Sequence, residues 1–450
     1  MRGNDKYLKF TKESIPKLII QMAIPSTLAM FVGIAYSLVD TYFVSKISTD
    51  AMAAVGLAFS FISVIQALGL LFGHGSGNYI SRMEGAKNRK ESSKMAITGL
   101  IVSFFIGLVI MILGNAFVID LVYFLGATKK LEFLTREYLQ ILLIGTPFMI
   151  ASLTMNNQFR LQGNAGLGAI AIMLGAVSNC ILDPIMIFGL DLGIKGAAYA
   201  TIIGEIIGFL TLIIASRFKD SVRYNIKDFC VNKVIIRELF SGGIPNFLRE
   251  IFIAFSLAIL NNKLKAYGES YIASFTIVNR LILAGTYIMV GVGHGFQPIC
   301  IFNYGANLYE RVKKSLNFTL RFAVIFMVFI EVIFIVKSHG LIRIFRNDNS
   351  IINIGSKILK IQSFTLPLIG YTTISGMFLQ GTHKFKEATI ITTARQGFIY
   401  IPMIFILHYI FGLNGILYAQ PVSDLITFII AIVLVKRRNL ELVKNQCLKV

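Results

Sequence analysis

Apolar runs of about 20 residues recur along the whole chain, and this pattern limits what the chain can fold into. A run of that length crosses a bilayer as a helix, whereas the alternation typical of barrel strands is absent. Only 15% of the 450 residues are charged and the mean hydropathy is +0.72, while soluble domains are about a quarter charged. The sequence therefore predicts an all-α integral membrane protein.

Twelve transmembrane helices are expected from these runs. They lie at residues 17–45, 51–72, 93–114, 131–155, 164–189, 194–216, 237–262, 271–296, 313–336, 352–377, 387–410 and 412–435. The glycine-rich segment 73–77 is expected to end the second span. We expect that segment to allow close helix packing, since it lacks the lysine of a phosphate-binding loop.

The net charge of +20 is distributed unevenly along the chain. With a cytoplasmic N-terminus, 28 of the 43 Lys and Arg residues fall on the cytoplasmic side, 12 fall on the other side and three lie within spans. This asymmetry is the positive-inside pattern, which predicts that both termini are cytoplasmic. The basic residues thus orient the chain in the membrane, and no nucleic-acid partner is expected.

The second half of the chain repeats landmarks of the first half at a nearly constant spacing. Ile24-Pro25 recurs as Ile244-Pro245, and Gly73-His74-Gly75 recurs as Gly293-His294-Gly295 at the same separation along the chain. The spacing then drifts by one or two residues, as in Gln162-Gly163 with Gln380-Gly381, Pro184 with Pro402, and Gly193 with Gly412. Six is an even number of spans, so the halves are parallel repeats, as in transporters with two rocking halves. We expect an N-terminal lobe at 1–216, a cytoplasmic linker at 217–237, and a C-terminal lobe with a cytoplasmic tail at 238–450.

Asp40 is the only charged residue between Lys17 and Lys46, late in the first span. A carboxylate at membrane depth costs several kcal/mol unless it is paired, hydrated or protonated, so Asp40 is a candidate functional residue. The alternative is that Asp40 lies near the outer water interface. Pro25, earlier in the same span, removes the hydrogen bond to the carbonyl of Gln21 and predicts a bend there, with a packing role as the alternative.

Three polar residues on later spans are expected at the same depth as Asp40. Asn179 and Asp183 share one face of the fifth span, and Thr201 lies on the sixth. At about 1.5 Å per residue, all these side chains lie roughly 10 Å below the outer surface. Two carboxylates, an amide and a hydroxyl are hard oxygen ligands, so Asp40, Asn179, Asp183 and Thr201 form a candidate site for Na⁺ or a shared proton.

The corresponding positions of the second half carry no charge, since they are Leu260, Gly397, Ile401 and Gln420. This asymmetry favours a coupling-ion site in the first half.

We assign Tyr36, Arg249, Glu250 and Gln420 to a candidate substrate cavity. Arg249 and Glu250 are adjacent, so they are expected to point to different helix faces and not to neutralise each other, leaving Glu250 to attract cations. The alternative is that they pair with neighbours such as Arg280 or Arg395, while Gln420 and Asp424 form a weaker polar face.

Together these motifs resemble the MATE (multidrug and toxic compound extrusion) family, most closely its bacterial MepA-like branch. The resemblance covers essentially the whole chain. The residues that carry it are Ile24-Pro25, Val39-Asp40-Thr41-Tyr42-Phe43-Val44, Gly75-Ser76-Gly77, Ile80-Ser81-Arg82, Gly85-Ala86, the run 179–189, Gly196-Ala197-Ala198 with Thr201, Gly295-Phe296-Gln297-Pro298 and Asn303-Tyr304-Gly305-Ala306.

The resemblance implies twelve helices in two lobes and export of cationic, amphipathic drugs in exchange for inward Na⁺ or H⁺. It places Asp40, Asn179, Asp183 and Thr201 at the cation site of the first lobe, and Pro25 at a bend in the first helix. It further implies a multi-pass protein of the bacterial plasma membrane, in contact with lipid, acting as a monomer without a cofactor. The nearest alternative is a flippase for a lipid-linked precursor, although such flippases usually have fourteen spans. No nucleophile with its base appears, so an enzyme is not expected.

Overall fold

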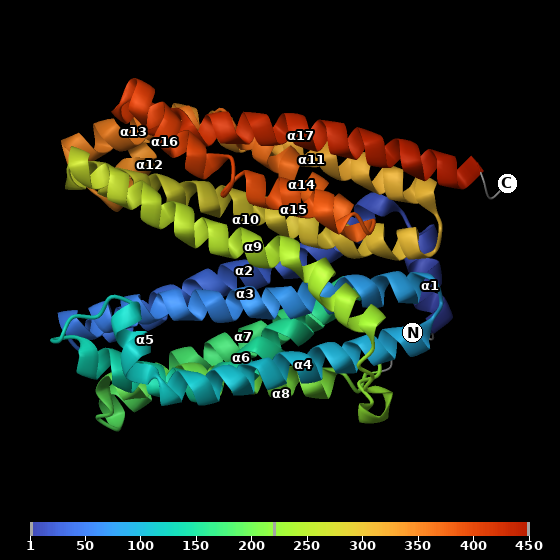
Figure 1. Ribbon diagram of the computed structural model, residues 1–450, viewed down its shortest axis with the longest axis horizontal. Helices are drawn as coiled ribbons and strands as arrows, with labels where there is room; N and C mark the ends of the chain where they lie inside the picture. The colour runs from blue at the N-terminus through green and yellow to red at the C-terminus, as the bar shows by residue number, and fades with distance from the viewer. Residues whose placement is uncertain (1–2, 219–221, 448–450) are drawn as a thin grey trace. The chain divides into compact units, whose positions relative to one another are not determined.

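The computed structural model describes residues 3–218 and 222–447, and every regular element in these ranges is helical. The first half contains α1 (Gly3–Lys12), α2 (Ile15–Ser45), α3 (Thr49–Gly85), α4 (Arg89–Ala116), α5 (Val118–Phe124), α6 (Glu132–Leu161), α7 (Ala165–Pro184), η1 (Ile185–Gly189) and α8 (Gly193–Ala215) (Figure 1). The second contains η2 (Ile226–Asp228), α9 (Lys233–Leu264), η3 (Lys265–Tyr267), α10 (Glu269–Gly305), α11 (Tyr309–Val336), α12 (Ser338–Phe345), α13 (Asn349–Ser363), α14 (Leu366–Gly381), α15 (Phe385–Ala394), α16 (Tyr400–Phe411) and α17 (Leu413–Cys447).

Ten helices of the described chain are long and apolar enough to cross a membrane. They account for ten of the twelve predicted spans, and the all-α membrane fold is confirmed. The outer faces of these helices are apolar, with Phe105 58% exposed and Ile112 56% exposed on α4. An apolar exterior suits a lipid environment, because a helix already satisfies its own backbone polar groups there.

The two remaining predicted spans, 352–377 and 387–410, are each divided into two helices. The first is formed by α13 and α14, and the second by α15 and α16. Proline explains both breaks, because it has no N–H and restricts the residue before it. Pro367 begins α14, and Pro402 cannot donate to the carbonyl of Phe398, which lies in the turn between α15 and α16. The twelve-span layout therefore holds, with two spans interrupted.

The glycine-rich segment 73–77 does not end the second span, so that prediction is wrong. α3 continues through it to Gly85. Gly75 lies against α9, where a Cβ would overlap the backbone carbonyl of Leu239. Absence of a side chain lets the two helix backbones approach, and this packing offsets the poor helix propensity of glycine.

The chain forms two compact units, and both α2 and α9 contribute to each of them. One unit comprises Met1–Lys12 and Ile24–Phe247, and the other comprises Glu13–Ala23 and Leu248–Val450. These boundaries differ from the lobe boundaries predicted at 216 and 238. Each division falls within three residues of a repeat-related proline, Pro25 in α2 and Pro245 in α9.

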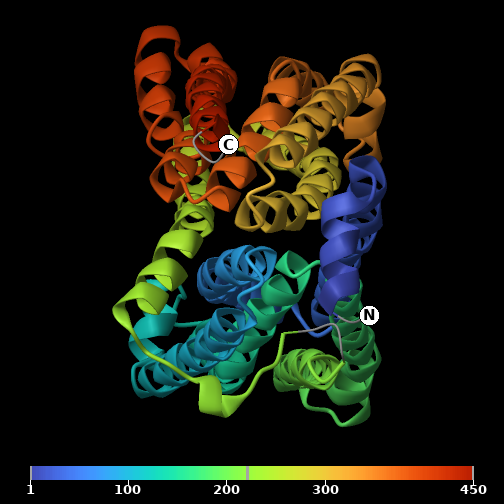
Figure 2. The ribbon, with the colours of Figure 1, turned by 90° about the vertical axis from the view of Figure 1, so that its right-hand side faces the viewer.

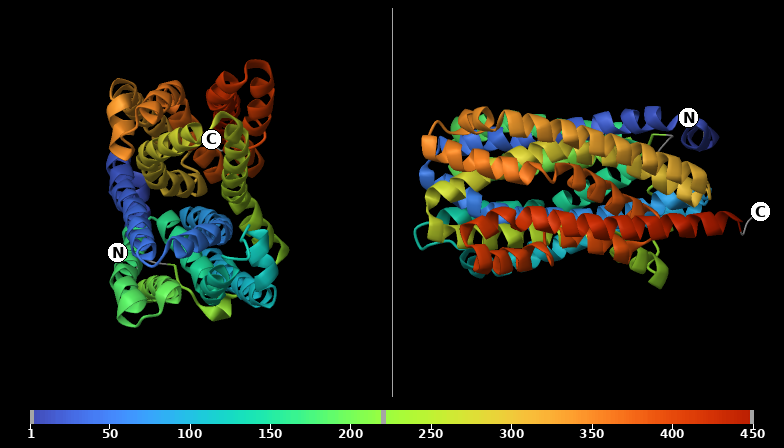
Figure 3. Two further views of the ribbon diagram at one scale, coloured as in Figure 1. Left: turned by 90° about the vertical axis from the view of Figure 1, so that its left-hand side faces the viewer. Right: turned by 90° about the horizontal axis from the view of Figure 1, so that it is seen from above.

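Each unit has its own hydrophobic core. In the first unit, the core includes Phe72 of α3 with Tyr138 and Leu142 of α6. There α8 packs beside α6 and α7, the green helices of Figure 2. In the second unit, α16 packs against the long α17, the orange and red helices of Figure 3.

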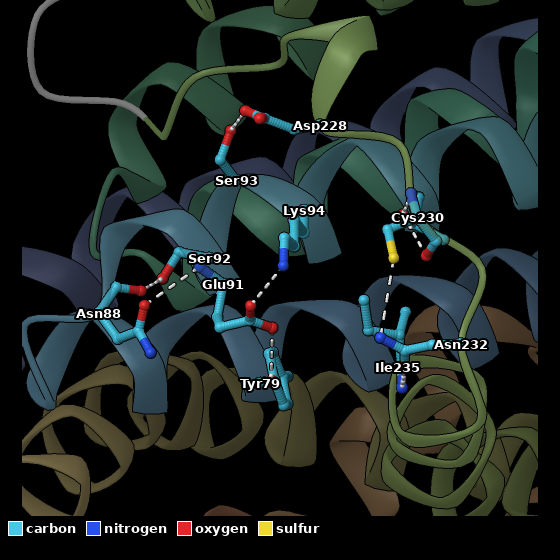
Figure 4. A network of polar contacts seen from close by, with 11 residues as sticks. Tyr79, Asn88, Glu91, Ser92, Ser93, Lys94, Asp228, Cys230, Asn232 and Ile235 are labelled. Carbon is cyan, nitrogen blue, oxygen red and sulfur yellow. Dashed lines mark hydrogen bonds and ion pairs between the residues drawn. The ribbon is translucent and has the colours of Figure 1, made fainter.

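The connection between the halves is bound to the first unit over its described residues 222–232. Ser93 on α4 donates to Asp228 at 2.7 Å (Figure 4). The Thr98 hydroxyl exchanges two hydrogen bonds of 3.2 Å with the Cys230 backbone. Tyr224 donates to Gln158 at 2.7 Å on α6. Burial raises the pKa of the Tyr224 phenol, so it stays protonated as a donor. Residues 222–232 of the linker therefore form a strap that is fixed to the first unit.

We expect the double substitution Ser93→Ala, Thr98→Val to release this strap. Each lost hydrogen bond costs about 1 kcal/mol, so trypsin should cleave after Arg223 and Lys227 several-fold faster, as measured by limited proteolysis of purified protein. Ser103→Ala is the matched control, because Ser103 lies on the same helix and donates only within it, to Leu100 at 2.9 Å. Equal cleavage rates in the double variant and this control would contradict a docked linker.

Candidate functional site

Asn179, Asp183 and Thr201 lie together in the first unit. They are 1%, 0% and 6% exposed. The Asn179 amide lies 3.4 Å from Asp183 Oδ1 and 3.5 Å from the Thr201 hydroxyl, and it is the donor in both contacts. Asn179 and Asp183 are one turn apart on α7, and Thr201 comes from the neighbouring α8, so the sequence spacing and the packing of two helices together form the cluster.

Asp40 and Tyr36 come to this cluster from α2. The Asp40 carboxyl is near enough to Asp183 for the two groups to repel each other when both are ionised. The phenol of Tyr36, one turn before Asp40, lies beside the Thr201 hydroxyl. Tyr36, which the sequence assigned to the substrate cavity, thus lies at the candidate cation site.

Three oxygens of the cluster are buried without a hydrogen-bond donor from the described residues. They are Asp40 Oδ1, Asn179 Oδ1 and Asp183 Oδ2. A buried acceptor left unpaired costs about 1–3 kcal/mol, and a carboxylate costs more. All three atoms are acceptors only, so a cation, a proton or a water molecule can serve as their partner. The donor set of two carboxylates, an amide oxygen and the Thr201 hydroxyl therefore fits Na⁺ or H⁺.

The helix geometry changes immediately after Asp183. Pro184 cannot donate a hydrogen bond to the carbonyl of Cys180, and the next five residues form the π-helical turn η1. Such turns widen a helix locally and occur often at functional sites. The turn separates α7 from α8 just beyond the carboxylate.

A cavity of about 90 Å³ opens beside the cluster within the first unit. Its wall includes Tyr36, Asn179, Thr201 and Glu205. Glu205 forms no ion pair with any described residue. The sequence predicted no role for Glu205. It follows Thr201 by one helical turn, and that spacing was the available signal.

In the second unit, Arg249 and Glu250 pair with each other. Arg249 Nη2 and Nε lie 2.7 Å and 3.2 Å from Glu250 Oε1. The prediction that these neighbours do not neutralise each other is wrong, because both side chains are long enough to bend around the helix and meet. The alternative pairing with Arg395 is also not adopted, since Arg395 binds Asp424 at 2.9 Å. Gln420 donates to the same Asp424 at 2.9 Å, so its amide is already engaged.

Comparisons with known proteins agree with this architecture. The MatE family model matches the chain twice, at residues 25–185 and 245–406, so the two matches begin at the repeat-related prolines Pro25 and Pro245. This correspondence confirms the internal repeat. The chain is 30% identical over 435 residues to the multidrug export protein MepA of Staphylococcus haemolyticus, covering 96% of each chain. It is also 30% identical over 428 residues to MepA of Staphylococcus aureus strain NCTC 8325, covering 95% of this chain and 94% of that one.

Solved structures share the fold. A crystal structure described as MATE in the bent conformation superposes with a TM-score of 0.92 at 23% identity, covering 98% of this chain and 99% of that chain. An outward-facing multidrug resistance MATE family transporter of the MOP superfamily superposes with a TM-score of 0.89 at 24% identity, covering 97% and 98%. With a family model that matches both halves and relatives aligned over nearly their full length, the chain belongs to the MATE family of membrane transporters.

Proposed function

We propose that the chain exports cationic, amphipathic drugs across the bacterial plasma membrane in exchange for inward Na⁺ or H⁺. The observation that carries this proposal is the set of three orphaned oxygens on Asp40, Asn179 and Asp183, buried beside a cavity. A cation binds tightly to the conformation in which these unsatisfied acceptors lie together and weakly to one in which they lie apart. Coupling requires such a difference in affinity between two conformations. The names of the relatives, multidrug export proteins, support drugs as cargo.

Coupling would act through α2. Because Asp40 lies on α2 and Asp183 on α7, a bound cation draws the two carboxylates together, and its loss lets them separate. Pro25 lies at the point of α2 where the two compact units divide, so α2 can change its bend there. Alternating access then follows when cation binding favours one bend. Both termini would lie in the cytoplasm, as the distribution of basic residues indicates.

The experiment that tests this proposal is ethidium transport by protein reconstituted into vesicles, under an imposed Na⁺ gradient or pH gradient, one at a time. We expect one gradient to drive ethidium uphill and the other to have little effect. Ethidium that moves only down its own gradient under both conditions would contradict antiport. Movement of a lipid-linked precursor in place of ethidium would instead favour the flippase alternative.

We expect Glu205→Gln to weaken binding of a monocationic drug about tenfold, or ~1.4 kcal/mol. Glu205 lines the cavity as a carboxylate without an ion pair among the described residues, so it can attract a cationic ligand. The measurement is equilibrium binding of ethidium to purified protein, with an uncharged analogue in parallel. Glu137→Gln is the control, because Glu137 already pairs with Lys195 at 2.7 Å. Equal losses for the cation and the uncharged analogue would rule out an electrostatic role for Glu205.

A further inference from the structure

Two helix breaks in the second unit meet at one buried carboxylate. Asp424 lies on α17 and is 1% exposed. Thr365 lies in the break between α13 and α14, and Arg395 begins the turn between α15 and α16. Both residues contact Asp424, so the interrupted spans and α17 share a single polar centre.

Both oxygens of Asp424 are satisfied at this centre. Oδ1 accepts from Arg395 Nε at 2.9 Å and from Gln420 Nε2 at 2.9 Å, and Oδ2 accepts from the Thr365 hydroxyl at 2.8 Å. The turn also frees the backbone carbonyl of Arg395, which accepts from the Ser423 hydroxyl at 3.1 Å. A carboxylate, hydroxyls and a carbonyl outside the helical hydrogen-bond pattern are the groups with which transporters bind cations at helix breaks. Here the cation present is a side chain of the protein.

The internal repeat relates this centre to Thr201 and Glu205 of the first unit. Gln420 and Asp424 are the repeat counterparts of Thr201 and Glu205. Each pair is separated by the same number of residues as Gly193 and Gly412. In the first unit Glu205 lines the cavity without an ion pair to any described residue, and the nearby cluster has three orphaned oxygens. In the second unit the counterpart carboxylate has a complete set of partners. The difference between the halves is the guanidinium of Arg395.

We propose that Arg395 is a tethered cation that permanently neutralises Asp424, the second unit's counterpart of Glu205. Guanidinium stays protonated at every biological pH, so its charge cannot be released to solution. The second half therefore holds its cation throughout the cycle, and only the first half exchanges Na⁺ or H⁺. This inference rests on the proposed function, since the first site must exchange cations for the contrast to matter.

The proposal predicts that removing the tethered charge creates a second exchangeable site. Arg395→Gln keeps a polar side chain but leaves Asp424 without a cation, and a buried carboxylate must then acquire one. We expect the purified variant to bind one more cation per chain than the unaltered protein. The measurements are binding of radioactive Na⁺ and proton uptake on acidification, each counted per folded protein.

Two further variants separate charge from structure. Arg395→Lys should bind the same number of cations as the unaltered protein, because the ammonium remains. The double variant Arg395→Gln, Asp424→Asn should also lose the extra cation, since no carboxylate remains to be neutralised. Unchanged Na⁺ binding and proton uptake in folded Arg395→Gln would overturn the proposal, and so would an extra cation that persists in the double variant.

Folding of Arg395→Gln is itself informative. If the variant is unstable in low-salt, neutral buffer, we expect acidic buffer or added Na⁺ to restore a monodisperse, folded protein, and we expect the double variant to fold without either. Failure of both a proton and Na⁺ to restore it would overturn the proposal. Failure of the proposed function gives a different result. In that case Asp183→Asn would not reduce the number of cations that the protein binds.

Discussion

Asp183→Asn is expected to reduce gradient-driven drug efflux at least ~100-fold, which corresponds to about 2.7 kcal/mol. The substitution removes one of the two carboxylates of the cluster, the one that accepts a hydrogen bond from the Asn179 amide. Because an amide carries no charge, the altered site attracts a cation less strongly. Cation binding then no longer favours one conformation of the protein over the other. Equilibrium drug binding should stay within a few-fold of the unaltered protein, because Asp183 does not line the cavity. Vesicle efflux and drug binding to purified protein are to be measured side by side.

Asp40→Asn should behave in the same way, and the double variant should be no worse than either single one. Removing one carboxylate already disables the shared site, so the effects are not additive. Asp50→Asn is the control, since Asp50 pairs with Lys130 at the surface of the same unit and is 40% exposed. Lost drug affinity with intact ion-driven exchange would mean that these carboxylates bind the drug and not the coupling ion.

Gly75→Ala is expected to have the largest effect on stability. Its Cβ would overlap the carbonyl oxygen of Leu239, and backbone cannot move aside as a flexible side chain can. Overpacking of this kind costs about 1–3 kcal/mol, and more where backbones must separate. We expect a lower Tm and a smaller folded fraction in detergent, measured by thermal unfolding of purified protein.

Gly56→Ala is the matched control for Gly75→Ala. Gly56 lies on the same helix, α3, and a Cβ there meets no atom within 4 Å. Because alanine favours helix over glycine by about 1 kcal/mol, the control should leave the Tm unchanged or raise it. A Gly75→Ala protein as stable as this control would show that the contact between α3 and α9 is not tight.

Much of the architecture follows from local sequence. Apolar run length determines the spans, because a helix satisfies its own backbone in lipid, and landmarks that recur at a nearly constant spacing reveal the repeat. The pairing of Asn179 with Asp183 also follows from one turn of helix. Glu205 and Thr201 share such a turn, yet the sequence carries no information about the cavity that gives Glu205 a role.

Tertiary structure alone decided how the charged side chains of the second half are partnered. Adjacent positions on a helix predict that Arg249 and Glu250 point to different faces. Their side chains are long enough to meet all the same, with Arg249 Nη2 2.7 Å from Glu250 Oε1. Arg395 and Asp424 lie on different helices, and only the break after α15 brings the guanidinium to the carboxylate. Periodicity describes the direction of a residue on its own helix. Which distant groups meet depends on how the helices pack and on where prolines interrupt them. For this reason the first half has buried oxygens without a donor among the described residues, whereas in the second half Arg395 supplies the cation.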